Sequence, residues 1–175
     1  MEPKKSGFNT ALKYAIITSL AALIFSIIMY MTGLYLNQGI SWLSFVILLA
    51  GLIFAVRDRR DKELGGFITY GQAFSQGFLF TLLLSVFGVI TGYIMLNFIA
   101  PDMIEETLKM SEQKLIEKGL TDDQVKMGMD MTRRFMTPVW MMIWIFVGNI
   151  IMGLILSLIV AAIFKKEDQH LQQPQ

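Results

Sequence analysis

The sequence predicts an all-α integral membrane protein. It is expected to form one domain, a bundle of four transmembrane helices with a helical hairpin outside the membrane between the third and fourth spans. The first observation behind this prediction is composition: 54% of the 175 residues are hydrophobic and 17% are charged, whereas soluble domains average roughly 25% charged. The second is that the charges are missing from four long runs. The third is that basic residues gather at alternate ends of those runs.

Four runs contain no Asp, Glu, Lys, Arg or His, and they cover residues 14–36, 40–56, 73–99 and 138–164. A membrane crossing needs roughly 20 apolar residues, because a helix rises about 1.5 Å per residue and the hydrocarbon core is about 30 Å thick. The second run has only 17 residues. We interpret it as a crossing because it lies between two longer spans and the chain must return, and a re-entrant second run is the main alternative.

The first run is predicted to be an uncleaved helix. It is far longer than the apolar region of about 7–15 residues in a signal peptide, and no clean small-x-small cleavage site closes it.

Basic residues near span ends favour the cytoplasmic side. Nine of the 15 lie on one predicted side: Lys4, Lys5, Lys13, Arg57, Arg59, Arg60, Lys62, Lys165 and Lys166. The loop 101–137 on the other side has six basic and eight acidic residues. Trp42, Trp140 and Trp144 fall near the outer ends of the second and fourth spans, where indole rings prefer the membrane interface. We therefore expect both termini in the cytoplasm.

The outer loop carries the signals of two helices. Pro101 ends the third span, and Gly119 is typical of a helix stop. Thr121 with Gln124 three residues later is a capping box that opens a second helix, which we expect to run through Phe135. The loop is thus predicted to be a helical hairpin that lies on the outer membrane face or extends the two spans outward.

Small residues line one stripe of each span at about 100° per residue. The stripes are Ala15, Ser19, Ala22, Ser26 and Gly33; Ser44, Gly51 and Ala55; Gly77, Thr81, Ser85, Gly88 and Gly92; and Asn149, Gly153, Ser157 and Ala161. Gly88 and Gly92 form a GxxxG pair. Helices in lipid associate through close packing and polar contacts, so we interpret the stripes as packing within the bundle, with a homodimer surface or a pore lining as alternatives.

Asn149 is the most polar side chain well inside a predicted span. We expect its amide to hydrogen-bond a neighbouring helix, and the alternative is contact with a substrate.

The stretch 57–63 is interpreted as a solvated charge run that sets topology. It leads into Gly65-Gly66-Phe67-Ile68-Thr69-Tyr70-Gly71-Gln72-Ala73-Phe74, whose Gly pair permits a tight turn before a helix with aromatic residues at helical spacing. This pattern, with Gly77 and the Ile99–Pro101 ending, resembles the bacterial membrane family known as domain of unknown function 4199 from about Gly7 to Phe164. The resemblance implies a four-helix membrane protein of a bacterial inner membrane and brings no catalytic residues.

The sequence lacks the residues that several kinds of catalytic or metal chemistry need. There is no cysteine, which excludes disulfides and thiolate chemistry, and the single histidine, His170, lies in a polar tail without a partner nearby. Met127, Met129 and Met131 suggest soft ligands for Cu(I). Met129 is expected to point about 200° from Met127 on a helix, so packing is favoured. The sequence predicts no catalytic residue, no cofactor and no metal.

We therefore expect a non-enzymatic multi-pass membrane protein with a structural, accessory or partner-binding role, and with the outer hairpin as its interaction surface. Its partners would be the lipid bilayer and a membrane protein or further copies of the chain. A net charge of +1 gives no basic field for nucleic acid. The alternative is a small oligomeric transporter or channel, although spans without ionisable residues argue against a proton-coupled carrier.

Overall fold

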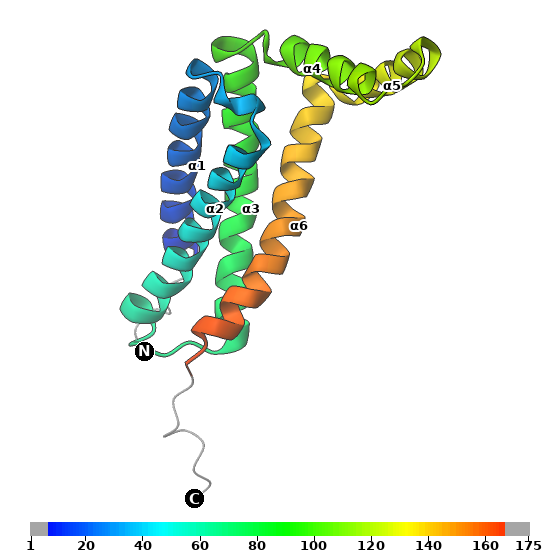
Figure 1. The fold of residues 1–175 in the computed structure, drawn as a ribbon. Helices are drawn as coiled ribbons and strands as arrows, with labels where there is room; N and C mark the ends of the chain where they lie inside the picture. Colours follow the sequence, from blue (N-terminus) through cyan, green and yellow to red (C-terminus); the bar gives the residue numbers. More distant parts are fainter. Residues whose placement is uncertain (1–6, 167–175) are drawn as a thin grey trace, which may run out of the picture.

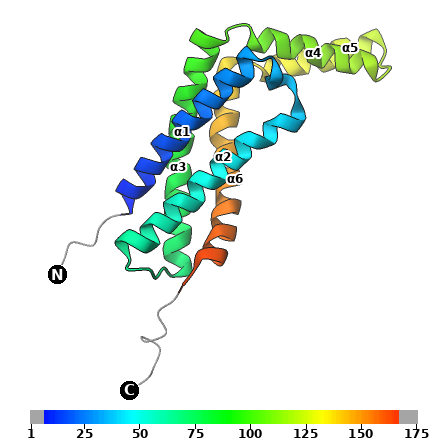
Figure 2. The ribbon, with the colours of Figure 1, turned by 60° about the vertical axis from the view of Figure 1, so that its left-hand side comes forward.

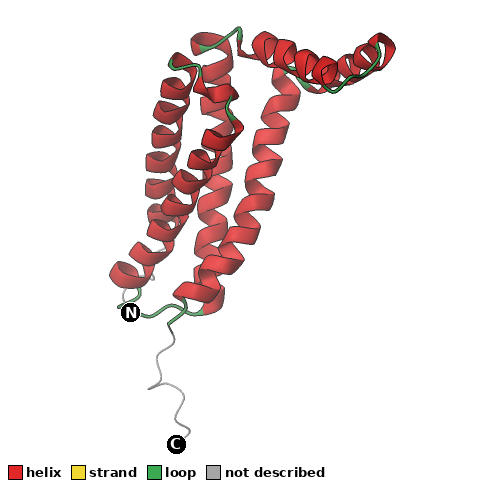
Figure 3. Ribbon diagram, viewed as in Figure 1, coloured by secondary structure: helices red, strands yellow, loops and turns green. Residues whose placement is uncertain are grey.

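The computed structural model describes residues 7–166, and this part of the chain is almost entirely helical (Figure 3). The α-helices are α1 (Phe8–Met31), α2 (Gln38–Asp58), α3 (Tyr70–Ile94), α4 (Met103–Glu117), α5 (Asp122–Phe135) and α6 (Pro138–Phe164). A short 3-10 turn, η1 (Leu34–Leu36), follows α1, and the π-helical segments η2 (Arg59–Glu63) and η3 (Met95–Ile99) continue α2 and α3. Residues 7–166 contain no strand beyond one isolated bridge, so the all-α prediction is confirmed.

The four long helices lie side by side, and the other two lie across one end. Figures 1 and 2 show α1, α2, α3 and α6 as the bundle, with α4 and α5 projecting from it as a hairpin. The start of α1, the connection from α2 to α3 and the end of α6 are at the opposite end (Figure 1). We call these two ends the hairpin end and the motif end, the latter after residues 65–74.

Three helices are long and apolar enough to cross a membrane: Phe8–Met31, Tyr70–Ile99 and Pro138–Phe164. The shortest has 24 residues, which at about 1.5 Å per residue is longer than a hydrocarbon core of about 30 Å. Large apolar side chains such as Ile24, Ile155 and Ile163 are exposed on these helices. An apolar outer surface is what lipid, unlike water, solvates well.

The helix starts follow capping chemistry. The N–H of Gln72 donates to Oγ1 of Thr69 at 3.3 Å, and the N–H of Thr69 donates to Oε1 of Gln72 at 3.0 Å, which completes a capping box at α3. The predicted box of Thr121 and Gln124 opens α5 in the same way. Gly119 precedes it with a φ of +73°, a conformation that glycine adopts without strain. The structure therefore has a capping box at Thr121 and a glycine turn before it.

The half of the bundle nearest the motif end is packed through glycines. A Cβ added to Gly153 would overlap Thr81, and one added to Gly77 would lie 2.8 Å from Oγ of Ser157. These contacts join α3 to α6. The hydroxyl of Thr81 donates to the carbonyl oxygen of Gly77 at 2.9 Å, so its polar group is satisfied inside its own helix. Backbones without side chains can approach closely, which is how helices associate in lipid.

Helix boundaries differ from the predicted ones mainly at the motif end. The first helix begins at Phe8 and the third at Tyr70, earlier than the predicted 14 and 73. The charged stretch 57–63 is not a loop, because α2 continues through η2 to Glu63. The fourth predicted span, 138–164, has the same bounds as α6, since Pro138 stands at its first position and Oγ1 of Thr137 accepts from the N–H of Trp140 at 3.5 Å.

Replacing Gly153 by leucine should separate α3 from α6, because the new side chain would occupy the space of Thr81. We expect a loss of about 1–3 kcal/mol of stability, the usual cost of overpacking, measured as unfolding in detergent by circular dichroism. Gly148→Leu is the matched control, since a Cβ there meets no atom within 4 Å. Equal stability of the two variants would contradict the glycine contact.

Candidate functional site

A cavity of about 400 Å³ lies between the helices toward the hairpin end. Every long helix contributes to its wall, together with η3 and the first residue of α4. The lining residues are Ala22, Leu23, Ser26, Ser44, Gly88, Thr91, Gly92, Met95, Leu96, Met103, Met141, Ile145 and Asn149. Its volume falls in the range of about 300–1,000 Å³ typical of small-molecule pockets.

The lining is apolar with a few polar groups and no ionisable side chain. The hydroxyl of Thr91 donates to the carbonyl oxygen of Gly88 at 3.2 Å, so it is occupied within its helix. The amide of Asn149 makes no side-chain hydrogen bond to any residue in the described range 7–166, and it is therefore free for a bound molecule. Apolar walls with a small number of placed polar groups are what bind and orient lipophilic ligands.

The cavity exists because glycines stand where larger side chains would fill it. A Cβ on Gly88 would lie 3.2 Å from Nδ2 of Asn149, and a Cβ on Gly92 would lie 3.0 Å from Cδ1 of Ile145. Of the four residues predicted for helix packing, Gly88, Gly92 and Asn149 meet at the cavity. The fourth, Gly153, lies apart from them against Thr81. The expected hydrogen bond from Asn149 to a neighbouring helix is not formed among the described residues.

A second, smaller cavity of about 120 Å³ adjoins the first and shares Ser26, Ser44 and Met103 with it. Its remaining lining residues are Phe25, Met29, Tyr35 and Ile40. Methionines from four elements thus surround the two cavities: Met29, Met95, Met103 and Met141. The unbranched thioether adapts its shape to irregular guests. Sequence reasoning missed this group, because its members are far apart in the chain and belong to no motif.

Two tyrosines hold the root of the hairpin over the bundle. The hydroxyl of Tyr30 donates to Oδ1 of Asp102 at 2.6 Å, and the hydroxyl of Tyr35 donates to Glu106. Both carboxylates lie at the start of α4, where negative charge is also favoured by the helix dipole. The hairpin is therefore fixed to α1 and η1 and is not held by its two chain connections alone.

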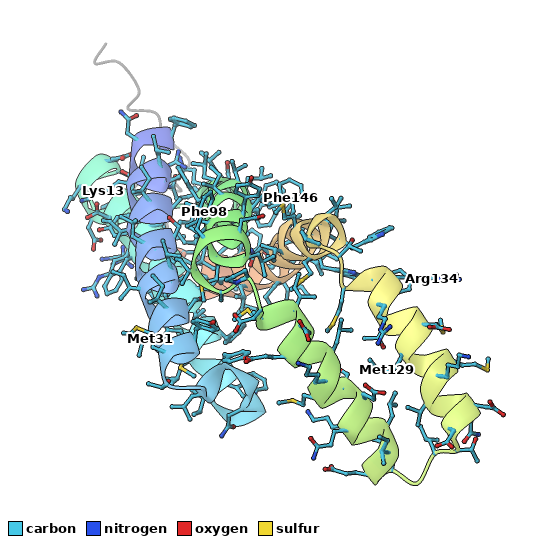
Figure 4. The ribbon with its side chains drawn as sticks, turned by 90° about the horizontal axis from the view of Figure 1, so that it is seen from above. Lys13, Met31, Phe98, Met129, Arg134 and Phe146 are labelled. Carbon is cyan, nitrogen blue, oxygen red and sulfur yellow. The ribbon has the colours of Figure 1, made fainter. Side chains whose placement is uncertain are left out.

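The two hairpin helices pack through a small face. A Cβ on Gly128 would lie 3.1 Å from Cδ1 of Leu115, and Val125 and Met129 are buried. In Figure 4 Met129 lies where α5 adjoins α4. Met127 and Met131 are exposed, so the three methionines weighed as copper ligands do not converge. Packing explains Met129 without a metal.

The Gly-Gly pattern builds the turn into α3. Gly65 and Gly66 have φ values of +66° and +92°, which glycine tolerates best. The N–H of Gly66 donates to the carbonyl oxygen of Arg60 at 2.8 Å, which closes the end of η2. Ala73 is buried in the core and Phe74 stacks on Phe78.

The same turn holds the end of α6. Ile68 and Lys166 exchange two backbone hydrogen bonds of 2.9 and 2.8 Å. The ammonium of Lys166 also lies 5.5 Å from the centre of the Phe67 ring, within the range of a cation–π contact. Gln72 completes the cap of α3, whereas a Cβ on Gly71 would meet no atom within 4 Å. The motif residues therefore act in folding at this end.

The charge run 57–63 is only partly solvated, which corrects the prediction. Nη1 of Arg59 donates to Oε1 of Gln76 at 2.8 Å, and the hydroxyl of Thr10 donates to Glu63. Nε of Arg59, Oε2 of Glu63 and Nε2 of Gln76 are buried without a hydrogen-bond partner in the described chain. Gly7 lies against this group, since a Cβ there would overlap Arg59 and Gln76. The signal available in the sequence was Gln76, a polar side chain one helical turn after Gln72 in a run without charges.

His170 lies outside the described residues. Within residues 7–166 no three histidine or carboxylate side chains come together as a metal site.

Removing the amide of Gln76 should destabilise the fold by about 1–3 kcal/mol, because Arg59 would keep a buried charge with fewer partners. We expect Gln76→Leu and Arg59→Met each to lower the unfolding midpoint. The double variant should lose less than the sum of the two, since residues in one hydrogen-bond network do not act additively. Strictly additive losses would show that the 2.8 Å bond contributes nothing.

Comparison with known proteins gives one match. The family model for a protein of unknown function, DUF4199, matches residues 13–166. No curated protein matches the chain, and no solved structure matches it. The matched segment runs from the first turns of α1 to the bridge after α6 and includes the cavity, the hairpin and the Gly-Gly turn. The chain therefore belongs to the DUF4199 family of proteins of unknown function.

Proposed function

We propose that this chain is a non-enzymatic membrane protein that crosses a bilayer four times and serves as a binding module. Its ligand would be a small lipophilic molecule with one hydrogen-bonding group. The observation that carries the proposal is the cavity of about 400 Å³, which all four long helices line and into which an unpaired amide, Asn149, opens. An accessory role follows if the bound molecule is delivered to or shared with a partner membrane protein.

The fourth crossing would be α2. It has 21 residues, or about 31 Å at 1.5 Å per residue, and its stretch 40–56 carries no charge. It runs beside the three longer helices (Figure 2). Four crossings would also account for the start of α1 and the end of α6 lying at one end of the bundle (Figure 1).

The charge pattern supports the motif end as the cytoplasmic side. Arg57, Arg60 and Lys62 lie at the motif end, and Lys165 and Lys166 follow α6 there. Positive residues near span ends are retained in the cytoplasm. This orientation gives cytoplasmic termini and an outward-facing hairpin, and the proposed setting is a bacterial inner membrane.

The chemistry of the cavity favours binding over catalysis. General acid–base or nucleophilic catalysis needs a titratable side chain within reach of the reacting group, and the lining of the larger cavity has none. Asn149 can both donate and accept a hydrogen bond. In a membrane interior such a bond contributes about 0.6–2 kcal/mol, enough to orient a ligand whose affinity comes from apolar contact.

A photoreactive alkyl diazirine without a headgroup tests the proposed site. After reconstitution and irradiation, the probe should label Met95, Met103 and Met141, as mapped by mass spectrometry of peptides. Gly92→Leu should reduce this labelling at least tenfold, because leucine fills the space and displaces only the flexible end of Ile145. Gly148→Leu, on the same bundle but with open space around it, should label like the parent chain.

Two outcomes would end the binding proposal. One is labelling of lipid-exposed positions only. The other is that the three methionines are labelled in Gly92→Leu as strongly as in the parent chain, while Gly92→Leu and Gly148→Leu unfold at the same temperature.

A small oligomeric transporter or channel is the second proposal. The observation that favours it is the cavity between the helices toward the hairpin end. A pathway through one chain would have to part the contacts of Gly153 with Thr81 and of Gly51 with Thr18, so passage would need an oligomer or a second conformation.

Flux of small ions and neutral solutes into reconstituted vesicles tests this second proposal. If the cavity is part of a pathway, we expect flux that Asn149→Leu abolishes while the protein still folds. Vesicles that carry the parent chain and show no flux above empty vesicles for any solute would exclude transport.

A further inference from the structure

The hairpin of α4 and α5 has two chemically different faces. On α5, Met127, Met131 and Phe135 recur every four residues and form one row, with 71%, 65% and 48% of each side chain exposed. At about 100° per residue, Lys126, Asp130 and Arg133 fall on another side of the same helix. A surface helix in water does not align large apolar side chains in this way without a partner.

Two contacts join the apolar side of the hairpin to the bundle at the root of the hairpin. The ring of Phe135 meets the ring of Trp140, at the start of α6, edge to face with a centroid distance of 5.7 Å. Met103, the first residue of α4, lines the cavity below. The next residues on that side of α4 are Thr107 and Met110. The Thr107 hydroxyl is satisfied within α4, because it donates to the carbonyl oxygen of Met103 at 2.7 Å.

By helical spacing, Glu105 and Lys109 lie on the side of α4 opposite Met103. Glu105 and Lys109 form an ion pair of 2.8 Å there. The hydrogen bond from Lys109 lowers the pKa of Glu105, and the same bond raises the pKa of Lys109. Both groups are therefore ionised at neutral pH, and this side requires water.

The apolar row continues the surface of the transmembrane helix. Val139, Trp140 and Trp144 are exposed on the first two turns of α6, and indole rings prefer the boundary between headgroups and acyl chains. Because Phe135 touches Trp140, the row meets this boundary at its Phe135 end. In Figure 1 the hairpin projects sideways from the end of the bundle, so its underside lies where a leaflet would be.

We infer that the hairpin is an interfacial element, which rests on the bilayer surface at the hairpin end with the Met127–Met131–Phe135 row among the lipids. Its occupant is the lipid leaflet, not a protein. The inference rests on the proposed membrane crossing and is independent of any ligand in the cavity. Amphipathic helices bind in this way with the apolar face at the boundary of headgroups and acyl chains. The hairpin then forms a shelf beside the cavity, next to Met103.

The absence of cysteine allows single-cysteine variants without background labelling. Met127→Cys, Met131→Cys and Phe135→Cys, and Lys126→Cys and Asp130→Cys as matched controls, would carry an environment-sensitive nitrobenzoxadiazole dye in phosphatidylcholine vesicles. We expect blue-shifted emission for the three row positions, with at least threefold stronger quenching by nitroxide lipids than at the controls. Aqueous iodide should quench the controls more strongly.

Three results would overturn the inference. Equal iodide quenching at all five positions would mean that the row faces water. Shielding of the row without nitroxide quenching would identify a buried protein contact, and shielding that disappears on dilution into excess lipid would identify a second copy. Carbonate washing separates these failures from failure of the membrane proposal, because a chain that does not cross the bilayer is released, whereas a chain whose hairpin faces water stays in the pellet.

Discussion

The rest of the bundle depends on close contact between α3 and α6. The two helices meet at glycines, where one of them has no side chain. Between apolar helices in lipid the hydrophobic effect gives no net attraction, so association must come from close packing and polar contacts. Gly77 against Ser157 and Gly153 against Thr81 supply it. Both contacts lie on the motif side of the cavity, and Gly88 and Gly92 of the same helix line the cavity wall.

The sequence predicted the helices well because their signals are local. Residues 138–164 were bounded correctly by Pro138 and by the charges after Phe164. The start of α1 was missed because the predicted span was bounded by the nearest charged residue, Lys13. This side chain is exposed, and its Nζ lies 4.0 Å from Oδ2 of Asp58. Long basic side chains can reach water from within a span's end, so the backbone continues as helix.

The parts that could not be predicted depend on contacts between distant segments. A stretch such as 57–63 suggests solvation at every residue, and only the approach of Gly7 and Gln76 buries Arg59. The cavity could not be predicted from the sequence for a similar reason. The stripes placed Gly88, Gly92 and Asn149 on the faces that meet, but a small residue is compatible with both tight contact and empty space. Which of the two occurs depends on the neighbouring helix and on methionines that no local pattern connects.

The two ends of the molecule therefore differ in how strongly their helices are held together. At the motif end the Ile68–Lys166 bridge, the Arg59–Gln76 bond and the glycine contacts all link separate helices, so opening there would break many interactions together. At the hairpin end the cavity wall is largely apolar and includes three methionines and two glycines, whose rearrangement costs less than breaking a hydrogen-bonded contact. Regions that bind are drawn from the less stable parts of a fold. A cavity placed on the hairpin side of the Gly153 and Gly77 contacts can change shape for a guest while these contacts keep the bundle assembled.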